Sequence, residues 1–240
     1  MSENKFKLNV DKTKFLLAGP AKRLQRVQKI SVKMDGVDLV ECENGRECLL
    51  GVIIQSDLKW TAQIEAQCGK LAGIEKLRRV MSSSAKKIII EGVLNSVLSY
   101  CLPVFGGCNV AEIMSLQTLQ NRAARIALNL PPRSNRNGMF DTLGWLTVKQ
   151  LIVYYSLVAI FRIRSSGQPC YLAKVLLNEN HNGHIIVKNN GLQLYRNSFM
   201  FRGPIQWNML PISIRREGKL KNFKINLSKW IMENIERFED

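Results

Sequence analysis

The chain has 240 residues, enough for one large domain or two small ones with most apolar side chains buried. Apolar residues make up 46% of it and charged residues 22%, a composition unlike that of a disordered chain. The 35 Lys and Arg residues outnumber the 19 Asp and Glu residues, so the formal net charge is +16. Such a field attracts polyanions, nucleic acid first and anionic membrane second; the alternative is a solvated basic surface that binds nothing specific.

The cysteine pattern indicates the cellular compartment, and the length of the apolar runs indicates whether the chain can span a membrane. Six cysteines show no regular spacing and no C-x-x-C pair, and the N-terminal stretch lacks the apolar segment of a signal peptide. We therefore expect free thiols and an intracellular location, with nucleus and cytoplasm not distinguished. The longest apolar run, around 157–160, is broken by Arg162 and Arg164 and is too short for a bilayer of roughly 30 Å. We expect no membrane partner.

Strand signals fill the region from Phe6 to Ile54. Short runs rich in Val, Ile, Leu and Phe alternate there with turn formers. The pairs Asp35-Gly36 and Asn44-Gly45 suit hairpins, because glycine accepts the positive φ that such turns require. This pattern predicts a small antiparallel strand region, interrupted by a short basic helix over 20–28.

From Trp60 onward the apolar period becomes helical. Capping and stop signals, such as Ser82–Ser84, Thr147 and Pro131-Pro132, predict four helices over 60–81, 85–100, 111–130 and 147–164. The fourth is apolar over most of its circumference, which predicts a central position. Beyond a candidate boundary at 165–169, we expect a short helix over 171–177, a polar loop and two amphipathic segments.

These elements predict an α+β fold that is predominantly α. A small antiparallel strand region is followed by a helical bundle and then by a small helical C-terminal region. The predicted division is 1–58, 59–165 and 166–240.

The third predicted helix carries a basic face. Its apolar residues fall on one side, and Arg122 and Arg125 fall on the other with Asn121 and Asn129. Arginine offers a planar fork of donors, so a stripe of this kind can grip successive phosphates. The alternative is a solvated outer face.

A second basic group lies on or near the exposed side of the helix over 60–81. It consists of Lys70, Lys76, Arg78 and Arg79. Lys86 and Lys87 follow at the start of the next helix. Lysine on an exposed helix face is ordinary, so the alternative of a solvated surface carries more weight here.

Other candidates favour structure over chemistry. In the segment 198–211, aromatics interleaved with Arg202 can stack on unpaired bases, but such spacing is more often core packing, which we favour. His181 and His184, with Cys170 upstream, do not form the two tight ligand pairs of a zinc site, so we expect no metal. The chain has no Gly-rich phosphate loop, nucleophile elbow or paired carboxylate. We expect no complete enzyme site.

Seven sequence blocks, taken in order, resemble the C-terminal portion of reverse transcriptases from non-LTR retrotransposons, especially the jockey-like group. They cover essentially the whole chain: LNVDKTKFLL (8–17), LLGVIIQSDLKW (49–60), LSYCLPVFGGC (98–108), LQTLQNRAARIAL (116–128), FDTLGWLTVKQ (140–150), SFMFRGPIQWNMLPISIR (198–215) and NFKINLSKW (222–230).

The resemblance implies a role for each part of the chain. Residues 1–58 correspond to the end of the palm, where Lys12 is the basic residue near the incoming nucleotide. Lys14 is a further nucleic-acid-binding candidate. Leu50 and Gly51 lie in the core near the turn of the hairpin that holds the primer's 3′ end. The helices over 60–164 form the thumb, which packs along the template-primer duplex, and the remainder is the segment after the thumb.

The resemblance also implies what is missing. The family polymerase uses paired aspartates to hold Mg²⁺, and these lie upstream of the first block, where only seven residues precede Leu8 and none is Asp. We expect a fragment without cofactor or turnover that binds RNA or an RNA–DNA duplex through backbone contacts, weakly and in a salt-sensitive way. The alternatives are a protein-interaction module that self-associates through exposed apolar surface, a subunit completed by a partner chain with the aspartates, and a decayed relic with no selected activity.

Overall fold

The structure is a computed structural model that describes residues 9–27, 30–78, 83–135, 138–188 and 191–234. Most of these residues lie in helices and a few in short strands, which confirms the predicted α+β, predominantly α class. The chain forms two compact units, Met1–Glu65 and Ala66–Asp240, and each is described by itself. The predicted division into three parts stays a prediction.

In its described residues, the first unit holds three two-stranded pairs. Two are antiparallel, as expected, but β1 pairs with β4 in parallel. Its strands are only two to four residues long, shorter than the apolar runs that predict them. The elements are η2 (Val10–Lys12), β1 (Lys14–Phe15), α1 (Ala21–Leu24), β2 (Lys33–Met34), β3 (Val37–Asp38), β4 (Val40–Glu41), η3 (Glu43–Gly45), β5 (Arg46–Leu49) and β6 (Val52–Gln55).

Two residues with positive φ close each antiparallel hairpin. In the β2–β3 turn, Asp35 has φ 50° and Gly36 has φ 82°, as predicted. In the β5–β6 turn, Leu50 has φ 48° and Gly51 has φ 80°. Both φ pairs match the primed turns that follow the twist of a hairpin. The prediction for Asn44-Gly45 is wrong, because this pair forms η3 at the open end of the β5–β6 hairpin.

Helix α2 (Thr61–Ala72) is joined to this hairpin by two glutamines. The Ala62 amide donates to Gln55 Oε1 at 2.7 Å, and the Ile53 amide donates to Gln63 Oε1 at 2.9 Å. Both glutamine side chains are buried, so these bonds satisfy backbone donors away from water. The predicted helix over 60–81 becomes α2 followed by the 3₁₀ segment η4 (Gly73–Arg78), and residues 79–82 lie outside the described part.

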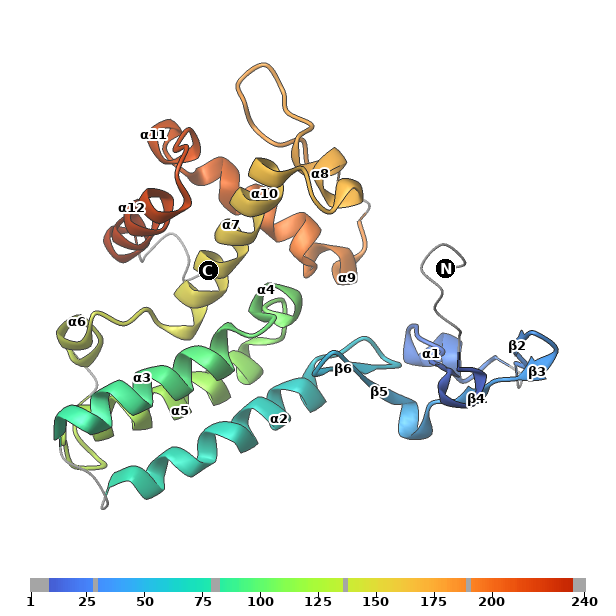
Figure 1. Cartoon of the computed structure of the whole chain (residues 1–240), viewed down its shortest axis with the longest axis horizontal. Coiled ribbons are helices and arrows are strands. Elements are labelled where there is room, and N and C mark those ends of the chain that lie inside the picture. The colour runs from blue at the N-terminus through green and yellow to red at the C-terminus, as the bar shows by residue number, and fades with distance from the viewer. Residues whose placement is uncertain (1–8, 28–29, 79–82, 136–137, 189–190, 235–240) are drawn as a thin grey trace. The chain divides into compact units, whose positions relative to one another are not determined.

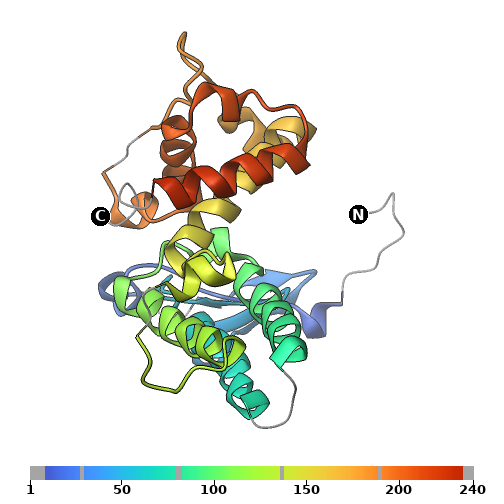
Figure 2. The same cartoon turned by 90° about the vertical axis from the view of Figure 1, so that its left-hand side faces the viewer.

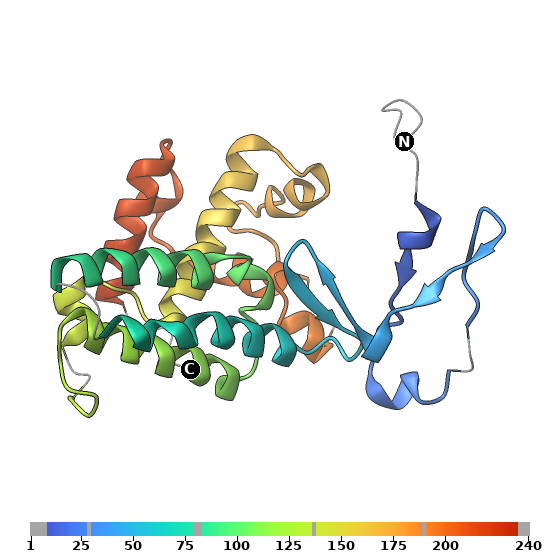
Figure 3. The ribbon, with the colours of Figure 1, turned by 60° about the horizontal axis from the view of Figure 1, so that its bottom comes forward.

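The second unit is helical in its described residues (Figures 1 and 3). Its long helices match the predicted ones within a few residues, whereas α4 and α6 fall in stretches for which no helix was predicted. The helices are α3 (Ser83–Ser99), α4 (Leu102–Phe105), α5 (Val110–Ala127), α6 (Met139–Leu143), α7 (Val148–Ser166), α8 (Cys170–Leu176), α9 (Gln193–Arg196), α10 (Phe199–Met209), α11 (Ile212–Arg215) and α12 (Leu220–Glu233).

Helix α7 is the centre of this unit, as its all-round apolar character predicts. It contacts α3, α4 and α5 on one side and α8, α10 and α12 on the other (Figure 2). Thr147 caps its N-terminus in a capping box with Gln150, and Leu157 and Ile160 are fully buried. Helix α7 thus connects both groups of helices. The buried residues before and after the predicted boundary at 165–169 belong to one hydrophobic core.

The C-terminal part of this core is aromatic. Trp207 stacks on Phe223 with ring centroids 5.8 Å apart, and Phe223 stacks on Phe161 at 4.4 Å. The Arg164 guanidinium lies over the Trp207 ring, 5.2 Å from its centroid. Trp207 is only 1% exposed, which confirms the core interpretation of segment 198–211 for its largest side chain.

Two glycines let backbone segments approach closely where α4 ends. A Cβ added at Gly107 would lie 1.8 Å from the Asn197 carbonyl oxygen, and one at Gly106 would lie 2.6 Å from Ile152 Cγ2. Any side chain would therefore separate the α4–α5 connection from the start of α10 and from α7. Gly107 belongs to the block 98–108, and Arg202 Nε, of the block 198–215, would lie 3.3 Å from the same added Cβ.

Cys108 follows this contact and is a weakly acidic thiol. Burial, reinforced by the nearby Glu112 carboxylate, raises its pKa to about 11. Only the thiolate reacts, so iodoacetamide near neutral pH is expected to label the exposed Cys48 and Cys170 well before Cys108. Labelling of Cys108 should then rise about tenfold per pH unit below that pKa. Peptide mass spectrometry measures this, and equal rates for Cys108 and Cys48 near neutral pH would contradict it.

Candidate nucleic-acid interface

The positive charge is concentrated in the second unit. Residues 66–240 contain 24 Lys and Arg against 10 Asp and Glu, whereas residues 1–65 contain 11 against 9. The second unit is therefore the source of the field that attracts polyanions.

The basic residues of α2 and η4 face solvent. Lys70, in the last turn of α2, and Lys76, in η4, are exposed and form no ion pair with a described residue. Leu71 and Ile74, which lie between these two lysines in the sequence, are buried. The apolar side of this segment therefore points inward. η4 packs against α3 and α5. The Arg78 side chain and all of Arg79 lie outside the described part.

The two arginines of the predicted basic stripe on α5 lie in different environments. Arg122 is exposed, opposite a face on which Leu116, Ala123 and Ile126 are buried. Arg125 is half-buried, and its Nε donates to the Ser134 carbonyl at 3.0 Å. Arg125 therefore holds the turn that follows the helix, and Arg122 is the better placed of the two for a phosphate.

The two lysines at the start of α3, Lys86 and Lys87, also lie in different environments. Lys86 is buried, 8% exposed, and its Nζ donates to Asn129 Oδ1 at 3.1 Å. Its expected place on the surface is therefore wrong, because this lysine ties α3 to the end of α5. Lys87 is exposed, and its Nζ lies 3.9 Å from the Glu91 carboxylate.

In the first unit the predicted residues lie on separate elements. Lys12 ends η2 and Lys14 begins β1, and both side chains are exposed. Leu50 is 84% exposed in the β5–β6 turn, so its predicted place in the core is wrong. The turn forces this outcome, because both of its residues sit at the hairpin tip, beyond the last paired strand residues Leu49 and Val52.

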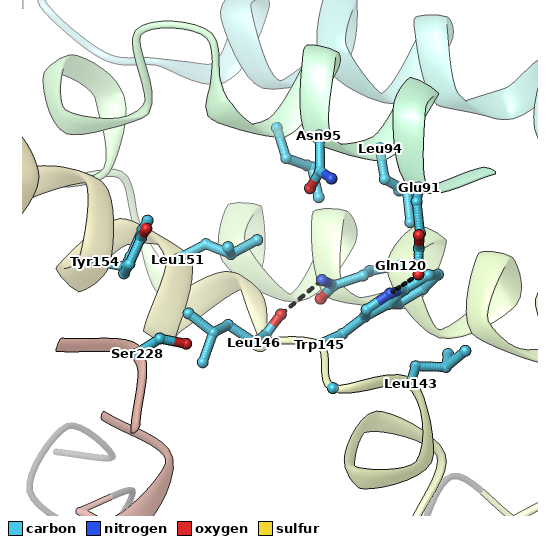
Figure 4. Close-up of a pocket in the computed structure, with 12 residues that line it drawn as sticks. Glu91, Leu94, Asn95, Gln120, Leu143, Trp145, Leu146, Leu151, Tyr154 and Ser228 are labelled. Atoms are coloured by element: carbon cyan, nitrogen blue, oxygen red, sulfur yellow. Dashed lines mark hydrogen bonds between the residues drawn. The ribbon is translucent and has the colours of Figure 1, made fainter. Parts of the chain in front are cut away.

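A polar network holds α5 against the start of α7. Gln117 Oε1 accepts the Val148 amide at 2.9 Å, and Gln120 Nε2 donates to the Leu146 carbonyl at 2.8 Å. Gln120 also lines a pocket of about 300 Å³ in which Trp145 Nε1 donates to Glu91 at 3.0 Å (Figure 4). These bonds tie side chains of α3 and α5 to residues 145–148, at the start of α7. The network thus positions the helix that carries Arg122.

Sequence reasoning missed a third basic group, around α11 and α12. Four of its side chains are exposed: Arg216, Lys219, Lys221 and Lys229. The signal was present, since RREGKLKNFK (215–224) holds five basic residues and one acid. The buried Phe223 and Leu227 turn the apolar side of α12 inward and leave these lysines outside.

The described residues hold neither a metal cluster nor a membrane-spanning helix. His181 and His184 flank Gly183 in a loop, and no group of three or more His, Cys, Asp or Glu side chains there is arranged to hold a metal ion. All six cysteines are free thiols, as predicted. Of the helices that the structure describes, none is both long and apolar enough to cross a bilayer.

Comparison with known proteins leaves the geometry and charge as the guides to function. No protein-family model matches the chain, and neither a curated protein nor a solved structure matches it significantly.

Proposed function

We propose that this chain is a fragment of a non-LTR retrotransposon reverse transcriptase that binds RNA or an RNA–DNA duplex without sequence specificity. The binding surface is formed by Lys70, Lys76 and Arg122, and is called the α2–α5 surface below. The resemblance implies nucleic-acid contacts for Lys12, Lys14, Arg78 and Arg79 as well.

The observation that carries the proposal is the charge of the second unit, +14 from its 24 basic and 10 acidic residues. Lys70, Lys76 and Arg122 face solvent without an acidic partner among the described residues. Phosphates exchange condensed counterions for such side chains, and this exchange favours binding without reading the bases. The ordered sequence blocks support the choice of a primer-template duplex as the ligand.

The test is a charge-reversal variant, Lys70→Glu/Lys76→Glu/Arg122→Glu, titrated by fluorescence anisotropy against an RNA–DNA hybrid across a salt series. Three lost phosphate contacts should lower the slope of log K against log salt by about three and weaken low-salt binding by at least about tenfold.

The matched control is Lys22→Glu/Arg23→Glu/Arg26→Glu, which reverses three exposed charges in the first unit. It changes the net charge by the same amount, so it should lose less affinity than the α2–α5 variant. Equal losses in both variants would mean that only total charge matters, and the α2–α5 surface would be rejected.

A second candidate, a protein-interaction module, is favoured by exposed apolar side chains on α5. Val110 and Met114, one turn apart, are 63% and 62% exposed. Sedimentation of the purified chain separates the two proposals. A concentration-dependent dimer that Met114→Lys abolishes would favour this candidate, whereas a monomer that binds the hybrid would favour the first.

A further inference from the structure

A hollow of about 560 Å³ lies in the second unit, where the end of α7, the loop after α8, and α10 and α11 meet. Its wall includes Arg164, His181, Trp207, Arg215 and Arg216, and we call it the arginine pocket. Among the described residues that line it, the only acid is Glu179, so the three guanidiniums leave this part of the wall with a positive charge.

Two of the guanidiniums are held in place by the fold. Arg164 Nη1 donates to the Leu176 carbonyl, while Nη2 forms an ion pair with Glu179. Arg215 Nε donates to the Leu210 carbonyl at 3.1 Å, and its Nη1 donates to the Gly183 carbonyl at 2.7 Å. Side chains fixed in this way lose little further freedom when a ligand binds.

Several donors of the pocket remain without an acceptor among the described residues. The Trp207 indole N–H is buried and has no hydrogen-bond partner. Arg215 Nη2 and the whole Arg216 guanidinium make no described hydrogen bond or ion pair. The guanidinium donors of Arg215 and Arg216 can therefore bond a ligand that supplies acceptor oxygens, and the Trp207 indole lies close enough to report on it.

We propose that the arginine pocket binds a phosphate group. Phosphate offers several acceptor oxygens and negative charge, and arginine forks match its geometry. Glu179 does not oppose it, because Arg164 already neutralises that carboxylate. The volume admits a nucleotide, so the phosphate can be free, carried by a mononucleotide, or at the end of a polynucleotide. None of the three residues of the α2–α5 surface lines this pocket, so the two sites are tested separately.

The test follows the Trp207 indole N–H by ¹⁵N NMR of the full chain, titrated with inorganic phosphate, a nucleoside 5′-monophosphate and a 5′-phosphorylated trinucleotide. Each titration is matched in ionic strength with chloride. The Trp207 signal should shift in a saturable way, while the Trp145 indole, already bonded to Glu91, stays unchanged. Binding of all three probes points to phosphate alone, and binding of the trinucleotide only points to a polynucleotide end.

The variant is Arg216→Gln, which removes an exposed guanidinium and leaves the anchored Arg215 intact. It should weaken phosphate binding by about tenfold. Its matched control is Lys221→Gln, an exposed lysine on α12 that does not line the pocket, and this variant should bind like the wild type. No saturable Trp207 shift with any probe, or equal affinity of Arg216→Gln and the wild type, would overturn the proposal.

Discussion

Replacing Trp207 with Ala is expected to lower the free energy of unfolding of the second unit by about 3–5 kcal/mol, the usual range for removing a fully buried aromatic. Trp207 is 1% exposed and stacks on Phe223, which in turn stacks on Phe161. The truncation leaves a cavity between α7, α10 and α12 and also removes the ring beneath Arg164. Chemical denaturation followed by circular dichroism measures the loss.

The control for this prediction is Ile212→Ala, because Ile212 is 52% exposed beside the same pocket. Its cost should stay within about 1 kcal/mol, since little apolar surface is lost from the core. A cost below about 1 kcal/mol for Trp207→Ala as well would mean that the aromatic stack does not hold the C-terminal helices on α7.

Gly107→Ala is expected to destabilise the same unit by about 3 kcal/mol or more, at the upper end of the range for overpacking. The new Cβ would lie 1.8 Å from the Asn197 carbonyl oxygen and 2.8 Å from the carbonyl carbon. Both are backbone atoms, so the strain cannot be relieved by rotating a side chain. Thermal or urea unfolding of the variant measures the cost.

Gly92→Ala is the matched control. Gly92 lies inside α3, and a Cβ there would meet nothing within 4 Å. Alanine is a better helix former, so this variant should be more stable than the wild type by about 0.5–1 kcal/mol. If Gly107→Ala were as stable as Gly92→Ala, the close approach of the two backbones would be rejected.

The sequence predicted the elements whose signals are local. The apolar residues of α7 and its Thr147 cap lie within one stretch, so both its bounds and its central place were readable. The hairpin at Asp35-Gly36 was predicted for the same reason. The short helices α4 and α6 were not, because one turn of helix leaves no period to detect.

The candidate site was predicted less well, because the partners of its side chains are distant in sequence. In the sequence, Lys86 resembles an ordinary surface lysine. Its hydrogen-bond partner, Asn129, lies 43 residues later in the chain, so no local pattern indicates the contact. Arg125 falls on the polar side of its helix, yet the turn after the helix folds back to present the Ser134 carbonyl. The arginine pocket joins residues from Arg164 to Arg216, so no local pattern could reveal it.

The most direct test of the proposed function is titration of the unmodified chain against an RNA–DNA hybrid and against a single strand of the same length, over a salt series. The proposal predicts tighter binding to the hybrid, with log K falling steeply and linearly with log salt. A folded chain that binds neither ligand at low salt, or that prefers the single strand, would contradict it.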